Sequence, residues 1–224
     1  MCGRYISPDE AAIERFWHLG GRSNPNPFRG LFNAAPTLKL PVVRVHTDCG
    51  REIALLRWGL IPSWAKDAAI GARMTNARAE TVAEKPAFRS SFRRRRCLVP
   101  MAGFYEWQKV GGRKVPHYVQ LLDAEIFGVA GLHEHWPGKD GAEPVESFTI
   151  ITTDANEMMA RIHDRMPAIL AEEDHAAWLD PANESTDSLR KLLRPYPAEA
   201  MRAYPIGARV NYVRNDGPEL LDPA

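Results

Sequence analysis

The stretch CLVPMAGFYEW, residues 97–107, determines which fold class the sequence predicts. Its two halves, 97–100 and 103–107, are rich in the apolar and aromatic residues that favour β-strands. Five further segments have a similar composition and strand length: 40–45, 52–58, 115–122, 126–133 and 146–153. Strands therefore dominate the middle of the chain, and we expect them to form an antiparallel, barrel-like β-sheet.

Helix signals lie on both sides of these strands. Ser7 and Pro8 have the residue types of a helix N-cap and a first helical position, and Thr81 with Glu84 has the spacing of a capping box. Three later segments are also expected to be helical: 155–162, 172–179 and 185–193. The prediction is one α+β domain over residues 1–224, with helices that flank the barrel-like sheet.

The composition limits the kinds of partner. The chain has 29 Lys and Arg against 28 Asp and Glu, a net charge of +1. This balance excludes a globally polybasic protein, so any contact with nucleic acid depends on a local cluster of positive charge. The most basic run, Arg93–Arg96, could be a solvated face or could help to hold phosphates. No apolar run approaches the roughly 18 residues that a membrane-spanning helix needs, so we expect no membrane partner.

The cysteines and histidines indicate neither a disulfide framework nor a metal site. Cys2, Cys49 and Cys97 are odd in number and far apart, which fits a reducing cytoplasm. His133 and His135 share a strand face, but no third ligand stands at a recognisable spacing. We therefore expect a cytoplasmic protein with no metal and no cofactor.

Cys2 directly follows the initiator methionine. Removal of Met1 would leave an N-terminal cysteine, whose α-amine (pKa about 7.7–8.0) and thiol (pKa about 8.5) are both available near neutral pH. Such a pair can form an imine with an aldehyde and then close it into a five-membered thiazolidine, whereas an internal cysteine has no free amine. Position alone instead favours a small apolar residue at the start of a strand.

Alternation along residues 103–107 divides their side chains between two faces of a strand. Phe104 and Glu106 share one face, and Tyr105 and Trp107 share the other. A carboxylate among aromatic residues is partly desolvated, which raises its pKa and suits a general acid or base near pH 7. An exposed Glu106 on an edge strand is the alternative, and the spacing does not decide between them.

Two other polar residues are candidates for chemistry. His163 stands in a polar turn beside Asp164, and histidine is the usual proton carrier near neutral pH. Asn76 could orient a reacting group. Each also has a structural interpretation, His163 as an exposed side chain and Asn76 as a helix cap.

Short motifs follow one another along the whole chain: MCGR at 1–4, FNAAP at 32–36, WGLIP at 58–62, NARAET at 76–81, RCLVP at 96–100, GFYEW at 103–107, HDRMP at 163–167 and NDGPEL at 215–220. This series resembles the SRAP family of SOS-response-associated peptidases, or abasic-site-processing proteins. Met101-Ala102 stands where the family usually has Ala-Asp, and 133–135 replaces a more aromatic and acidic stretch. Neither departure involves the proposed chemistry.

The resemblance implies an SRAP-like fold and one reaction. Family members recognise abasic sites in single-stranded DNA and bond to the ring-opened sugar through the N-terminal cysteine, as a thiazolidine. It also implies a monomer whose partner is this DNA, and a role in the DNA damage response. The implied catalytic residues are Cys2, Asn76, Glu106 and His163. The implied DNA-binding residues, with the tryptophans as stacking platforms, are Arg4, Asn33, Trp64, Arg78, Trp107 and Thr152.

Functions of other classes remain open. Met-Cys-Gly also opens class II glutamine amidotransferases, although their oxyanion and glutamine-binding motifs are not recognisable here. A non-covalent binder of single-stranded DNA would show only salt-reversible binding. The family name also records peptidase activity, with which self-removal of Met1 or release of the crosslink is compatible, and an imine intermediate would allow lyase-like cleavage of the DNA.

Overall fold

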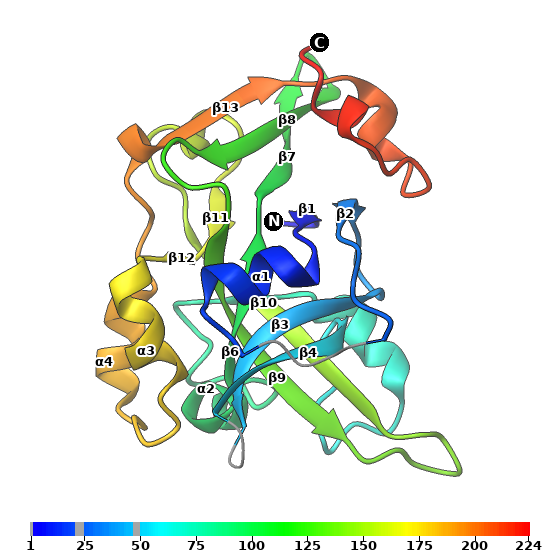
Figure 1. The fold of residues 1–224 in the computed structure, drawn as a ribbon, viewed down its shortest axis with the longest axis vertical. Helices are drawn as coiled ribbons and strands as arrows, with labels where there is room; N and C mark the ends of the chain where they lie inside the picture. Colours follow the sequence, from blue (N-terminus) through cyan, green and yellow to red (C-terminus); the bar gives the residue numbers. More distant parts are fainter. Residues whose placement is uncertain (1, 21–24, 47–49) are drawn as a thin grey trace.

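A computed structural model describes residues 2–20, 25–46 and 50–224 of the chain. Five of its strands close into a barrel (Figure 1): β3 (Lys39–His46), β4 (Gly50–Trp58), β6 (Arg96–Met101), β9 (Phe127–Trp136) and β10 (Val145–Asp154). The pairings run β4–β3–β6–β9–β10, and β10 returns to β4. Four of these pairings are antiparallel, and β10 is parallel to β4.

Three short strands extend the barrel: β5 (Asn76–Arg78), β11 (Arg165–Pro167) and β12 (Ile169–Leu170). Both β5 and β11 pair with the second half of β10, where Asn76 is opposite Ile150 and Pro167 is opposite Thr152. Two motifs that are about 90 residues apart in the sequence, NARAET and HDRMP, therefore lie on either side of one strand.

A second, open sheet lies against the barrel. Its strands, in spatial order and all antiparallel, are β13 (Met201–Pro205), β8 (Arg113–Leu121), β7 (Gly103–Val110), β1 (Arg4–Ser7) and β2 (Leu31–Ala34). In the β1–β7 pair, Arg4 is opposite Tyr105 and Tyr5 is opposite Phe104. This register carries the N-terminal residues toward the part of β7 that contains Glu106.

The α-helices are short: α1 (Glu10–Phe16), α2 (Arg89–Arg94), α3 (His175–Leu179) and α4 (Thr186–Leu192). The remaining helical segments are 3₁₀ turns: η1 (Ala68–Arg73), η2 (Met159–Arg161), η3 (Glu172–Asp174), η4 (Ala198–Ala200), η5 (Ala208–Asn211) and η6 (Pro218–Leu221). The predicted helix at 185–193 is confirmed as α4, and 172–179 is divided into η3 and α3. No helix among the described residues has the length and apolar character needed to cross a membrane.

Two predicted helix starts are wrong in detail. Asp9, not Ser7, caps α1, because its Oδ1 accepts a hydrogen bond from the backbone N–H of Ala12 at 2.7 Å. The segment that starts at Thr81 is a series of turns, and the helix begins only at Arg89. Pro86, which lacks a backbone N–H, lies in these turns and interrupts the helical hydrogen bonds.

The core has two main parts. One fills the barrel and its junction with the open sheet, and it includes Cys2, Trp58 and Phe104. The other lies between the barrel and the helices, where the indole N–H of Trp178 donates to the carbonyl of Cys97 at 2.9 Å. The expected fold class, an α+β domain around an antiparallel, barrel-like sheet flanked by helices, is confirmed.

Candidate functional site

Asn76 joins the N-terminal segment to the barrel. Its Nδ2 donates a hydrogen bond to the carbonyl oxygen of Cys2 at 2.9 Å. Its Oδ1 is buried and has no hydrogen-bond partner within the part of the chain that the structure describes. The predicted helix-cap role of Asn76 does not apply, because the residue begins strand β5. The Asn76 side chain therefore holds the backbone of Cys2 through Nδ2, and its Oδ1 can still accept a hydrogen bond from another group.

Cys2 and Glu106 influence each other inside the protein. The Cys2 side chain is 0% exposed and Glu106 is 2% exposed. Burial raises the pKa of the Cys2 thiol well above its ordinary value, and the negative charge of Glu106 raises it further. The thiol is consequently protonated at neutral pH, so it is not a ready thiolate. The alternative of an exposed Glu106 on an edge strand is wrong, because β7 lies between β1 and β8.

The faces of β7 agree with the alternation in its sequence. Phe104 packs in the same core cluster as Cys2, whereas Tyr105 and Trp107 belong to a separate cluster on the opposite face. Glu106 lies on the Phe104 side by the same alternation. The aromatic stretch therefore places a carboxylate next to Cys2.

His163 lies in a turn that is attached to β7. Its backbone N–H donates to the carbonyl of Met159 at 2.8 Å, and Gln108 in β7 donates from its side chain to the carbonyl of Arg161 at 2.7 Å. The Nδ1 of His163 accepts from the backbone N–H of Arg165 at 3.0 Å and is 2.8 Å from a carboxylate oxygen of Asp164. The first contact suits the neutral ring with its proton on Nε2, and the second suits the protonated ring.

Arg4 and Asn33 hold the C-terminal segment. Arg4 Nη1 donates to Asn33 Oδ1 at 2.8 Å and to the carbonyl of Val210 at 2.9 Å. The Nδ2 of Asn33 donates to three carbonyls, those of Val210, Tyr212 and Asn215, at 3.2, 3.2 and 2.9 Å. Asn33 is buried, so any contribution that it makes to DNA binding passes through the residues it positions.

Arg78 and Thr152 are opposite each other in the β5–β10 pair but face different surroundings. Arg78 is exposed, whereas the Thr152 side chain is buried and its Oγ1 lies 3.4 Å from the carbonyl oxygen of Ala77. The guanidinium of Arg165 binds Asp154 at 2.6 Å and the Thr152 carbonyl at 2.7 Å. Arg165 thus braces this edge of the site, a role that its position beside His163 in the sequence does not reveal.

The two tryptophans are presented differently. Trp64 is 55% exposed in the loop after β4. Trp107 is half-buried, and its indole N–H donates to Oδ1 of Asn211 at 2.8 Å. The first ring is open to a partner, while the edge of the second is fixed against the C-terminal segment.

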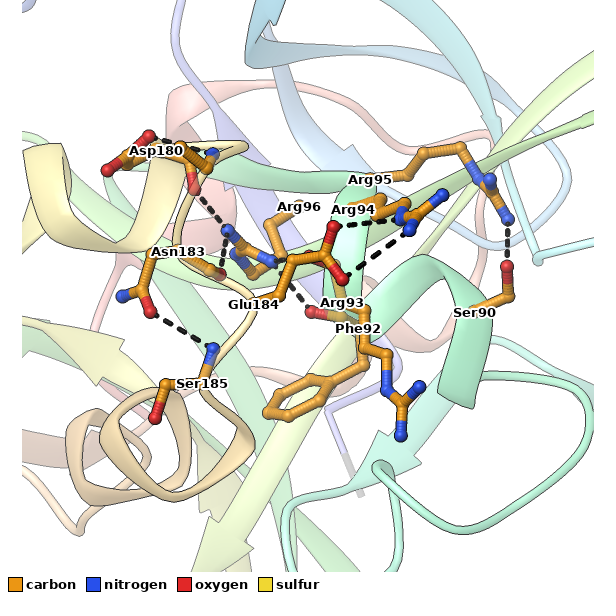
Figure 2. Close-up of polar contacts among 11 residues, drawn as sticks. Ser90, Phe92, Arg93, Arg94, Arg95, Arg96, Asp180, Asn183, Glu184 and Ser185 are labelled. Carbon is orange, nitrogen blue, oxygen red and sulfur yellow. Dashed lines mark hydrogen bonds and ion pairs between the residues drawn. The ribbon is translucent and has the colours of Figure 1, made fainter.

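The basic run is largely structural (Figure 2). Arg96 is buried and donates to the carbonyl of Phe92 in α2 at 2.9 Å. It also donates to the carbonyl of Trp178 in α3 at 2.6 Å, a contact that Figure 2 does not label. Arg94 pairs with Glu184 at 3.1 Å, and Arg95 pairs with Glu134 at 2.6 Å outside the view of Figure 2. Neither alternative for the basic run, a solvated face or a phosphate site, applies to Arg96, because its guanidinium is bonded to carbonyls at two helix C-termini.

The two histidines of strand β9 differ, because His133 is partly buried and His135 is exposed. Burial, with the nearby charges of Arg44 and Arg95, lowers the pKa of His133 to about 3. Glu134 accepts hydrogen bonds from Arg95 and from the Ser91 hydroxyl. Among residues 2–20, 25–46 and 50–224, no group of three or more His, Cys, Asp or Glu side chains is placed to hold a metal ion.

A closed five-stranded barrel, with Cys2 buried in its core and a buried glutamate that acts electrostatically on its thiol, defines a protein of SRAP-like architecture. The family model described as SOS response associated peptidase (SRAP) matches residues 1–213, and the chain belongs to this family. It is 40% identical over 225 residues to the abasic site processing protein YoqW of Bacillus subtilis (strain 168), with 99% of each chain covered.

More distant relatives agree. The abasic site processing protein HMCES of Gallus gallus is 35% identical over 92% of this chain and 68% of its own length. A solved structure of a Bacteroides thetaiotaomicron protein superposes with a TM-score of 0.79 at 32% identity, covering 95% of this chain and 90% of that chain. These matches establish the fold and the family.

Proposed function

We propose that the protein processes abasic sites in single-stranded DNA by forming a covalent crosslink, a thiazolidine between mature Cys2 and the ring-opened sugar. The observation that carries the proposal is the hydrogen bond from Asn76 to the Cys2 carbonyl, in a site where the charge of Glu106 raises the pKa of the Cys2 thiol. The names of the relatives YoqW and HMCES, both abasic site processing proteins, support the substrate class.

The raised pKa of the thiol indicates the order of the steps. The Cys2 amine, after loss of a proton to Glu106, attacks the aldehyde carbon to give a carbinolamine. Glu106 returns the proton to the hydroxyl group, which leaves as water and gives an iminium ion. The positive charge of the iminium next to the sulfur favours loss of the thiol proton and offsets the effect of Glu106. The sulfur then adds to the same carbon, so one aldehyde and one aminothiol give a thiazolidine and water.

His163 or Glu106 would supply the acid for this reaction, and Asn76 would orient Cys2. The abasic sugar rests mainly as a closed hemiacetal, and a general acid must protonate its ring oxygen before the aldehyde is released. His163 in its protonated form, or Glu106 when it carries a proton, supplies this acid. Asn76 does not titrate, and its buried Oδ1 is available to accept a hydrogen bond from the Cys2 amine.

DNA would be held by exposed groups around this chemistry. Arg78 is exposed and suits a phosphate contact, while Trp64 offers an open ring for stacking. Arg4 and Trp107 act partly through the C-terminal segment to which both are bonded. Asn33 and Thr152, which are buried, support this surface without forming it.

Lyase and peptidase activities would be consequences of the same site. An imine acidifies the neighbouring sugar carbon and permits β-elimination, and ring closure by sulfur suppresses that route. Removal of Met1 is required to expose the amine and is the simplest peptidase step. A dedicated amidohydrolase is less well supported, because a buried thiol with a raised pKa is a poor nucleophile toward an amide.

Intact-mass measurement tests the proposal. The mature protein is mixed with a single-stranded oligonucleotide that contains one abasic site, and the product is denatured before analysis. We expect protein without Met1 and a gain equal to the oligonucleotide minus one water. An oligonucleotide with tetrahydrofuran in place of the abasic sugar has no aldehyde and is the control that should give no adduct. Retention of Met1 in protein that forms the adduct would refute the mechanism.

A further inference from the structure

The backbone of residues 210–215 is fixed by side chains of the candidate site. Arg4 donates to the carbonyls of Val210 and Asn211, and Asn33 donates to those of Val210, Tyr212 and Asn215. Trp107 adds its indole hydrogen bond to the Asn211 side chain. In Figure 1 this C-terminal segment, in orange to red, passes close to β2. It is therefore a rigid rim of the site.

The ring of Tyr212 projects from this fixed backbone into solvent. Tyr212 is 61% exposed, and its neighbour Val213 is 47% exposed. Two buried tyrosines differ, since the hydroxyls of Tyr105 and Tyr118 donate to the carbonyls of Phe32 and Ala102. An isolated exposed aromatic residue is common, but this ring is exposed at the rim of the site and on a backbone held by three hydrogen bonds from Asn33.

An arginine lies beside the Tyr212 ring. The guanidinium of Arg214 lies 5.9 Å from the ring centroid, a cation–π distance, and Arg209 is also exposed. The carboxylate of Asp216, four residues after Tyr212, accepts a hydrogen bond from the backbone N–H of Asn33. An exposed ring beside arginines is the combination with which proteins hold a base and its phosphate in single-stranded DNA.

We propose that Tyr212 stacks on the base of a nucleotide that flanks the abasic sugar, and that Arg214 contacts the phosphate of this nucleotide. The segment that carries Tyr212 is joined to the candidate site by Arg4, which follows Cys2 by two residues and donates a hydrogen bond to the carbonyl of Asn211. In this proposal, a strand with its abasic sugar at Cys2 runs over this segment. The inference rests on the proposed function, and it assigns Tyr212 as a positioning residue that does not take part in the chemistry.

Non-covalent binding tests the inference without the crosslink. Single-stranded oligonucleotides with tetrahydrofuran as the abasic analogue carry 2-aminopurine on either its 5′ or its 3′ side. Stacking on a tyrosine ring quenches 2-aminopurine, so wild-type protein should quench on one side. Tyr212→Ala should lose this quenching and bind about 5- to 150-fold more weakly, the range for loss of one stacked base. Tyr212→Phe keeps the ring and should behave as wild type.

Controls separate the possible failures. Leu122→Ala removes another exposed apolar side chain, 52% exposed, and should leave both signals unchanged. Thermal unfolding of Tyr212→Ala should match wild type, since an exposed ring contributes little to stability. Unchanged binding and quenching in Tyr212→Ala, or equal losses in Tyr212→Phe, would overturn the inference. A wild-type protein that quenches in this assay but forms no adduct with true abasic DNA would instead overturn the proposed function.

Discussion

Replacement of Asn76 by alanine removes the side-chain hydrogen bond that holds the Cys2 carbonyl. The 2.9 Å hydrogen bond is lost, and the carbonyl is left facing an apolar side chain. An unsatisfied buried acceptor costs about 1–3 kcal/mol, and the lower part of this range applies because Asn76 is only partly buried. The antiparallel pairing of β1 with β7 begins at Arg4 and remains, so the damage should be confined to the N-terminal residues.

Catalysis should be affected more than folding. A loss of about 1 kcal/mol lowers the melting temperature of a domain of this size by about 2–4 °C. Displacement of a reacting group by about 1 Å, in contrast, can slow a reaction by about 100-fold. We therefore expect Asn76→Ala to unfold at nearly the wild-type temperature and to crosslink abasic DNA between about 10- and 100-fold more slowly.

The assay is single-turnover formation of the denaturant-stable adduct, followed on a gel with protein in excess. Asn183→Ala is the matched control, because Asn183 is also partly buried and its side chain accepts from the backbone of Ser185 at 3.2 Å, in the loop before α4. It should lower stability by a similar amount without slowing the crosslink. If Asn76→Ala reacts at the wild-type rate, or loses rate only in proportion to its unfolded fraction, Asn76 does not position Cys2.

Four further outcomes are expected. Glu106→Gln removes the general base and should slow adduct formation by about 10²- to 10⁴-fold in the same single-turnover assay; a rate within threefold of wild type would exclude Glu106. Arg78→Ala should reduce the slope of log K against log salt by about 0.7 on single-stranded DNA. Arg4→Ala should also weaken binding, because the C-terminal segment is released. If the slope is unchanged in both variants, the phosphates bind elsewhere. Cys2→Ala keeps an amine and should lose the stable adduct, gain borohydride-trappable crosslinking and nick abasic DNA; a heat-stable adduct without reductant would contradict the thiazolidine. Burial raises the pKa of the Cys2 and Cys97 thiols above the value of about 8.5 that a thiol has in the unfolded chain. Both thiols therefore favour the folded state below that pH, and this contribution to the free energy of unfolding is lost as the pH rises further. Denaturant unfolding at pH 8 and pH 10 should show this fall in stability, and the pH dependence should be shallower in Cys97→Ala.

Strand patterns in the sequence were sufficient to predict most of the strands and a barrel-like sheet, but not the strand pairings that close the barrel. The segments 97–100, 103–107, 115–122, 126–133 and 146–153 correspond to β6, β7, β8, β9 and β10, because alternation and residue type are local properties. The parallel pairings of β10 with β4 and with β5 are long-range, and no periodicity reports them. Helix α2 was missed for a related reason: its sequence, RSSFRR, has one large apolar residue, and packing of Phe92 in the core holds it.

The sequence also named the proposed reacting groups. Cys2, Glu106 and His163 were selected as candidates from chemistry and motif, since position after the initiator methionine, alternation on a strand and a polar turn are readable without a structure. The contacts that surround these residues were not recognisable from the sequence. Arg4, Asn33 and the tail around residue 212 come from three distant parts of the chain, and only folding brings their donors and carbonyls together.

The protonation state of Cys2 belongs entirely to the tertiary structure. An N-terminal cysteine in water has a thiol that ionises near pH 8.5. In the folded protein the same thiol is enclosed by the barrel core and lies within the field of Glu106, so desolvation and charge together keep it protonated. Residue type decides which ionisable groups the chain has, whereas burial, a property of many residues at once, decides whether the Cys2 thiol carries its proton.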